Sequence, residues 1–108
     1  MTPSVGRIVH YMLTEQDAAQ VMRRRTDGPS IADRVKEDKW PVGAQAHVGN
    51  PVSAGDVYPM LIVWVSAGDM VNGRVFLDGS DDLWVTSREQ VALGAVDKRG
   101  YWFQPARV

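Results

Sequence analysis

The sequence predicts a mainly β protein, a small barrel of about five short strands with a helical or irregular insert after the first strand. Residues 57–66 form a nearly continuous apolar run, and turn residues separate the other short β-like segments. These segments are too few and too short for a β-sandwich, so a closed core requires a strongly bent sheet.

Size and composition predict one globular domain over residues 1–108. Hydrophobic residues make up 44% of the chain and charged residues 23%, which are ordinary values for a single folded unit. The net charge of −1 argues against a protein whose main partner is a nucleic-acid backbone. Because the chain has no cysteine, disulfides, thiolate catalysis and cysteine-based zinc sites are excluded.

No apolar run approaches the length of a membrane span. The longest, residues 60–65, is far shorter than the roughly 20 residues required. The N-terminal stretch lacks the apolar core of a signal peptide. We therefore expect the chain in the cytoplasm of the cell that makes it.

The first strand is expected in residues 6–13 (GRIVHYML), where β-branched and aromatic residues alternate across two faces. Residues 14–25 (TEQDAAQVMRRR) predict a short helix, which Thr14 is suited to cap. Acidic residues in its first turn and arginines in its last complement the helix dipole. Gly28 and Pro29 then end the helix.

The insert is expected to extend over about residues 14–46. Residues 30–39 fit either a second short helix or a loop. Residues 15–39 contain six basic and six acidic side chains, a balance that favours a solvated excursion outside the core. Residues 40–56 carry two prolines and three glycines and are expected to be loop-like.

A three-stranded meander follows the insert. Residues 57–66 predict a strand buried on both faces, with Pro59 near its start, at an edge or at a bulge. Residues 70–77 predict the next strand. Asn72-Gly73 could form a tight hairpin turn, but we expect Gly73 to be a bulge, because a turn there leaves too little strand before it.

The remaining elements complete the barrel. Residues 78–82 predict a turn, residues 83–87 a strand and residues 101–103 a short last strand that Pro105 ends. Alternation places Tyr101 and Phe103 on one face of this strand and Trp102 on the other. We expect the barrel to be filled by Trp64, Phe76 and Leu83.

An SH3-like barrel has the same order of elements: a strand, a long first loop, a three-stranded meander and a short closing strand. Residues 55–65 (GDVYPMLIVWV) and 71–87 (VNGRVFLDGSDDLWVTS) resemble the central meander of SH3-like and Tudor-like small barrels. The resemblance implies the same small closed fold.

The chain also resembles a group of small proteins of unknown role encoded by actinobacterial phages and related genomes. The segments that carry this likeness are GRIVHY (6–11), GNPVSAGDVYP (49–59), VNGRVFLDG (71–79), LWVTS (83–87) and GYWFQPARV (100–108). The group typically ends in a Trp, another aromatic or His, a Trp and then Pro. The ending Tyr101-Trp102-Phe103-Gln104-Pro105 departs from that spacing. The resemblance excludes residues 29–46, implies a phage or prophage origin and brings no catalytic residues.

Three sets of residues could in principle bind a metal ion or form a catalytic site, but the sequence gives little support to any of them. Their members are His10, His47 and Asp56 for zinc, Ser87, His10 and Asp56 for a Ser–His–acid site, and Asp78, Asp81 and Asp82 for a divalent cation. None has the spacing or local signature that its chemistry requires. We expect no enzymatic activity, no metal and no cofactor.

The aromatic residues are more informative. The chain has nine of them, more than a small barrel can bury, and exposed aromatic surface marks interfaces. Tyr58, Trp84 and Trp102 are the candidates for a binding face. The alternative is that the insert packs over them.

These observations predict a non-enzymatic, phage-encoded interaction module acting through protein–protein contacts. A virion role, as a capsid decoration or head–tail component, would follow, with phage structural proteins or a second copy as partners. The alternative is a small-molecule or nucleotide-binding protein that sequesters a host defence signal. Aromatic rings would then stack a base, and phosphates would meet Arg23, Arg24, Arg74 or Arg99.

Overall fold

The computed structural model describes residues 2–26, 49–92 and 95–105. The segment expected to be a second helix or a loop, residues 30–39, and the loop-like residues 40–48 lie outside the described residues. The second of these segments includes His47, which was considered as a zinc ligand.

The described chain is mainly β, as expected. Its elements are β1 (Ile8–Met12), α1 (Glu15–Thr26), β2 (Val57–Val65), β3 (Val71–Phe76), β4 (Asp82–Arg88) and β5 (Trp102–Phe103). The strands form one antiparallel sheet in the order β4-β3-β2-β1-β5. The order of the elements along the chain is the predicted one, with β2, β3 and β4 as the meander and β5 as the short last strand.

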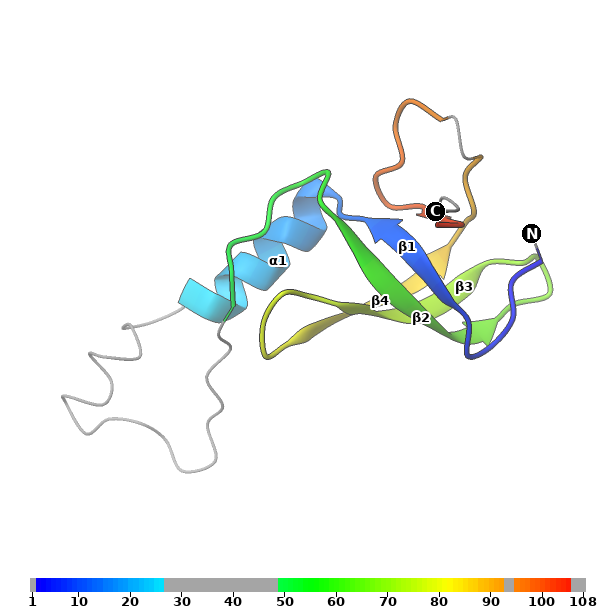
Figure 1. Cartoon of the computed structure of the whole chain (residues 1–108), viewed down its shortest axis with the longest axis horizontal. Coiled ribbons are helices and arrows are strands. Elements are labelled where there is room, and N and C mark those ends of the chain that lie inside the picture. The colour runs from blue at the N-terminus through cyan, green and yellow to red at the C-terminus, as the bar shows by residue number, and fades with distance from the viewer. Residues whose placement is uncertain (1, 27–48, 93–94, 106–108) are drawn as a thin grey trace, which may run out of the picture.

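The sheet curls into a half-barrel, and α1 lies at one end of it (Figure 1). Backbone hydrogen bonds link the chain just after β4 to β5. The Trp102 amide donates to the Glu89 carbonyl at 3.0 Å, and the Val91 amide donates to the Trp102 carbonyl at 2.9 Å. Because β5 also pairs with β1, it joins the two sides of the curled sheet.

The core consists of the side chains on the concave face. Alternate residues of each strand point inward, and residues outside the strands add to them: Leu13, Ala18, Val21, Val52 and Leu77. The inward strand residues are Val9, Tyr11, Met60, Ile62, Val71, Val75, Leu83, Val85 and Trp102. The expectation that β2 is buried on both faces is wrong, because only Met60 and Ile62 of its nine residues are buried.

Of the three side chains expected to fill the barrel, only Leu83 does. Trp64 and Phe76 are exposed. Phe76 follows inward-facing Val75 and therefore points outward. In β2 the register shifts between Ile62 and Trp64, so Val63 is an extra residue and Trp64 turns to the outer side. The sequence pattern alone did not reveal this bulge.

Gly73 lies inside β3 and does not form a turn. The register shifts lie beside it: β2 has the extra Val63, and β4 has one extra residue between the partners of Val71 and Gly73. The expectation that Gly73 is itself the bulge is therefore wrong: Gly73 is regularly paired, and the extra residues belong to the two neighbouring strands. A Cβ atom on Gly73 would lie 2.7 Å from Met60 Cγ, so this close approach requires glycine.

Candidate functional site

An outward-facing row of side chains crosses four strands of the sheet. Ile8 pairs with Leu61, Leu61 with Arg74, and Arg74 with Trp84, and residues directly opposite one another project on the same side. We call the outer face the surface made by Ile8, Leu61, Trp64, Arg74, Phe76 and Trp84. Four large apolar side chains of this face are between 42% and 57% exposed: Ile8, Trp64, Phe76 and Trp84.

Arg74 is the cationic residue of the outer face. Its guanidinium lies 5.3 Å from the centre of the Trp84 ring, and its Nη1 lies 3.4 Å from Asp82 Oδ1. The side chains of Arg74, Asp82 and Trp84 are all well exposed to solvent. The two contacts therefore orient Arg74 but contribute little to the stability of the fold.

The structure does not bring the three predicted interface aromatics together. Trp84 lies on the outer face, whereas Tyr58 and Trp102 both pair with Tyr11 in register. Because Tyr11 points into the core, its two partners share the inner side of the sheet. Trp102 is fully buried and Tyr58 is half-buried against the core.

Trp102 and Phe103 face opposite sides of β5, as expected, but neither is on the surface. Trp102 is 0% exposed and faces the core, and Phe103 is 7% exposed on the opposite side. The ring of Phe103 packs edge-on against the ring of His10, with 5.9 Å between the two ring centres. Lys98 Nζ lies 4.7 Å from the centre of the Phe103 ring. Tyr101 is 40% exposed. The more accessible ring of this segment is therefore Tyr101.

The four arginines considered for phosphate contacts also lie apart. Arg23 and Arg24 are in the second half of α1, and Arg24 pairs with Asp81 at 3.7 Å. Arg99 pairs at 3.7 Å with Glu15 at the opposite end of the same helix, and Arg74 lies on the outer face. A helix of 12 residues is about 18 Å long, so they do not form one site.

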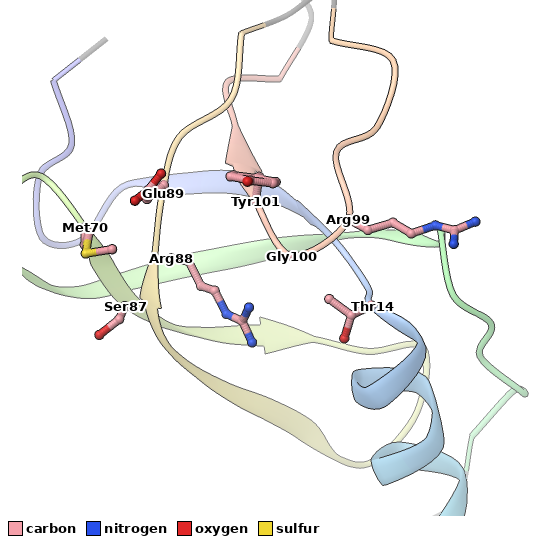
Figure 2. Close-up of a pocket in the computed structure, with 8 residues that line it drawn as sticks. All are labelled: Thr14, Met70, Ser87, Arg88, Glu89, Arg99, Gly100 and Tyr101. Carbon is pink, nitrogen blue, oxygen red and sulfur yellow. The ribbon is translucent and has the colours of Figure 1, made fainter.

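A pocket of about 310 Å³ lies where four segments meet: the start of α1, the turn before β3, the end of β4 and the turn before β5 (Figure 2). We call it the Arg88 pocket. It is lined by Thr14, Met70, Ser87, Arg88, Glu89, Arg99, Gly100 and Tyr101. Sequence reasoning singled out Arg99 but missed Arg88, because nothing in the local pattern marks the last residue of β4.

Arg88 is held beside a buried cluster. Its Nη2 lies 3.8 Å from Asp17 Oδ1, and its guanidinium lies 5.6 Å from the centre of the Tyr11 ring. The Tyr11 hydroxyl donates to Asp17 Oδ2 at 2.5 Å, and the Thr14 amide donates to the same oxygen at 3.0 Å. Arg88 Nε is buried without a hydrogen-bond partner.

Tyr11 stays protonated over the ordinary pH range. Burial raises the pKa of its phenol above the usual 10.0, and the hydrogen bond to Asp17 and the charge of that carboxylate raise it further. Arg88 opposes this shift only weakly. Tyr11 is therefore a neutral donor that orients Asp17.

The residues considered for catalysis and for metal binding do not come together in the described structure, because their side chains interact with other residues. His10 packs against Phe103, and Asp56 Oδ2 accepts a hydrogen bond from the Ser53 amide at 2.9 Å. In the acidic turn, Asp78 accepts from Asn50 at 2.6 Å, while Asp81 and Asp82 face Arg24 and Arg74. Among the described residues no group of three or more His, Asp or Glu side chains is placed to hold a metal ion.

Comparison with family models, with curated proteins and with solved structures gives no match. In the described part of the chain, no helix has both the length and the apolar character needed to cross a bilayer. The candidate surfaces therefore rest on their own geometry.

Proposed function

We propose that the chain is a phage-encoded, non-enzymatic interaction module whose outer face binds a structural protein of the phage particle. The observation that carries the proposal is the exposure of Ile8, Trp64, Phe76 and Trp84 on one side of the sheet. Contiguous exposed apolar surface of this kind is typical of interaction sites.

The chemistry of the outer face favours a protein partner. Tryptophan and arginine are among the residues that most often dominate the binding energy of protein interfaces. Trp84 and Arg74 lie together near the edge of the sheet, with Trp64 and Phe76 on the same side. A partner would desolvate these rings and strengthen the contact between the guanidinium and the Trp84 ring.

The role in a virion is supported by the resemblance to small phage-encoded proteins and by the small-barrel fold. A capsid decoration or head–tail component needs a stable scaffold with one adhesive surface. The curled sheet provides the scaffold, since its concave side holds the core and its convex side holds the outer face.

The proposal is tested by quantitative mass spectrometry of purified particles of the phage that encodes the chain. We expect the protein in particles at a fixed ratio to the capsid or tail proteins. Its absence from washed particles would rule out the virion role.

Matched variants test the surface itself. Trp84→Ser and Phe76→Ser should each lower incorporation into particles by roughly tenfold or more, as expected for hot-spot residues, while leaving the fold intact. Val96→Ser removes a fully exposed apolar side chain outside the outer face and should incorporate normally. Normal incorporation of both outer-face variants would show that another surface makes the contact.

Sedimentation velocity separates this partner from a second copy of the chain. We expect a monomer at rising concentration for the wild type and for Trp84→Ser. A wild-type dimer that Trp84→Ser dissociates would assign the outer face to self-association instead.

A further inference from the structure

We propose that the Arg88 pocket binds a small phosphate ester that carries a planar ring, a ligand of mononucleotide size. This inference is independent of the proposed function, because the pocket shares no residue with the outer face. The pocket also differs from the nucleotide site that the sequence suggested. Of the four arginines considered for that site, only Arg99 lines the pocket.

The pocket has the size and the construction of a ligand site. Its volume of about 310 Å³ lies at the lower end of the range for small-molecule sites, about 300–1,000 Å³. Its walls come from four separate segments of the chain: Thr14 at the start of α1, Met70 before β3, Ser87 to Glu89 at the end of β4, and Arg99 to Tyr101 before β5. The sheet and the helix together hold these segments in place.

Arg88 has unused capacity to bind an anion. The nearest oxygen of Asp17 lies 3.8 Å from Arg88 Nη2, which is beyond hydrogen-bond distance. The other oxygen of Asp17 accepts from Tyr11 and Thr14. The guanidinium is therefore positioned by its neighbours without a strong hydrogen-bonded ion pair, and its planar fork suits phosphate oxygens.

Arg99 supplies a second cation at the rim. Figure 2 shows its side chain extending outward, away from Arg88. Its partner Glu15 is 3.7 Å away and largely exposed, so this surface pair holds Arg99 only weakly. Rotation of the exposed side chain brings its charge to a bound ligand. Three carboxylates lie near the two arginines: Glu89 lines the pocket, Asp17 is 3.8 Å from Arg88 and Glu15 is 3.7 Å from Arg99. A bound phosphate must therefore compete with Asp17 and Glu15 for the two guanidinium groups.

The absence of a side chain at Gly100 keeps the approach to Arg88 open. Gly100 has a φ of +78, and a Cβ there would lie 3.0 Å from Thr14 Cγ2 and 3.3 Å from Arg88 Nη1. A larger residue would fill the space beside the guanidinium. Ser87, which also lines the pocket, has a φ of 53 and lies where β4 carries its extra residue.

Tyr101 supplies the surface for the planar part of the ligand. Its ring is 40% exposed and borders the pocket, next to Gly100 and above Arg88 in Figure 2. Stacking of a base on such a ring contributes about 1–3 kcal/mol in nucleic-acid-binding proteins. A phosphate at Arg88 and a ring on Tyr101 together define the ligand class.

The test is isothermal titration of the full chain with AMP, ribose 5-phosphate and adenosine. AMP has both groups, ribose 5-phosphate lacks the planar ring, and adenosine lacks the phosphate. We expect AMP to bind at least about tenfold more tightly than either of the other two. Absence of AMP binding at millimolar concentration, or equal binding of adenosine, would overturn the proposal.

Variants then assign the site. Arg99→Gln and Tyr101→Ala, both at exposed positions, should each weaken AMP binding by about tenfold. Arg88→Gln should abolish it, with a thermal melt to show that the variant is folded. Arg7→Gln removes another exposed arginine, just before β1, and should bind AMP as the wild type does. Equal losses in Arg7→Gln and Arg99→Gln would show a general charge effect and overturn the assignment.

Trp84→Ser separates this inference from the proposed function. It should lose incorporation into phage particles and keep its affinity for AMP. Loss of AMP binding in Trp84→Ser would place the ligand on the outer face and not in the Arg88 pocket.

Discussion

The hydroxyl of Tyr11 donates a hydrogen bond of 2.5 Å to Asp17 and so ties β1 to the first turn of α1. Both residues are buried, and the carboxylate also faces Arg88 from β4. One polar cluster thus joins the helix, the first strand and the fourth strand at the edge of the Arg88 pocket. Changes in this cluster should therefore affect both the stability and the shape of the pocket.

Tyr11→Phe should lower the free energy of unfolding by about 1–3 kcal/mol, because it leaves the buried Asp17 carboxylate without one of its donors. Urea denaturation followed by tryptophan fluorescence measures the change. The control is Tyr101→Phe, in which an exposed ring loses its hydroxyl and stability should stay within about 0.5 kcal/mol of the wild type. Equal stability of Tyr11→Phe and the wild type would show that the cluster is not stabilising.

Alkaline pH should destabilise the protein through Tyr11. Burial, followed by the hydrogen bond to Asp17, raises the pKa of Tyr11 above its ordinary value of 10.0. In the unfolded chain the phenol keeps its ordinary pKa, so above about pH 10 the unfolded state releases a proton that the folded state retains. The stabilising contribution is therefore complete below about pH 10 and is lost as pH rises toward the folded pKa. Urea denaturation between about pH 9 and pH 11 should show a steeper decline for the wild type than for Tyr11→Phe; parallel declines would contradict this assignment.

The order of the elements could be predicted from the sequence because it depends on local signals. Turn residues and β-branched runs marked the strands, and Thr14 with the acidic first turn marked the start of α1. The facing of Trp64 could not be predicted in this way. It depends on the extra residue Val63 in β2, and a bulge arises from pairing with a neighbouring strand, which the pattern within one strand does not contain.

The candidate surfaces were less predictable than the fold. Trp84 faces outward, as a binding residue must, but Tyr58 and Trp102 share the inner side with Tyr11. The Arg88 pocket combines residues from the start of α1, the turn before β3, the end of β4 and the turn before β5. Such a site exists only once the chain is folded, so no spacing in the sequence indicates it.

Gly73→Ala should destabilise the protein by about 1–3 kcal/mol, the usual cost of overpacking a core. The added Cβ would lie 2.7 Å from Met60 Cγ and 2.8 Å from the Leu61 carbonyl oxygen, and a backbone atom in a paired strand cannot easily move away. Thermal denaturation measures the loss. Gly68→Ala is the matched control, since its nearest neighbour, Ser66 Oγ, would be 4.0 Å away. Similar melting temperatures for the two variants would contradict the close approach of β2 and β3.

Trp102→Ala should cost about 3–5 kcal/mol, as truncation of a fully buried aromatic residue does. Phe103→Ala should cost less, because Phe103 lies outside the core cluster, against His10 and Lys98. Tyr101→Ala should be tolerated, since this ring is exposed. Denaturation of the three variants under the same conditions gives the order of the losses. A larger loss for Phe103→Ala than for Trp102→Ala would contradict the facing of β5.

Thr14→Ala should remove the cap of α1 and cost about 1 kcal/mol. Thr14 Oγ1 accepts a hydrogen bond from the Asp17 amide at 3.0 Å, and Asp17 Oδ2 accepts one from the Thr14 amide at 3.0 Å. Alanine removes the first of these bonds and keeps the second, so α1 should fray from its first turn while the barrel stays folded. Thr14→Ser keeps the hydroxyl and should retain most of the stability. Urea denaturation gives the free energies, and far-ultraviolet circular dichroism reports the helix. If Thr14→Ser lost as much as Thr14→Ala, the methyl group and not the hydrogen bond would be the stabilising part of Thr14.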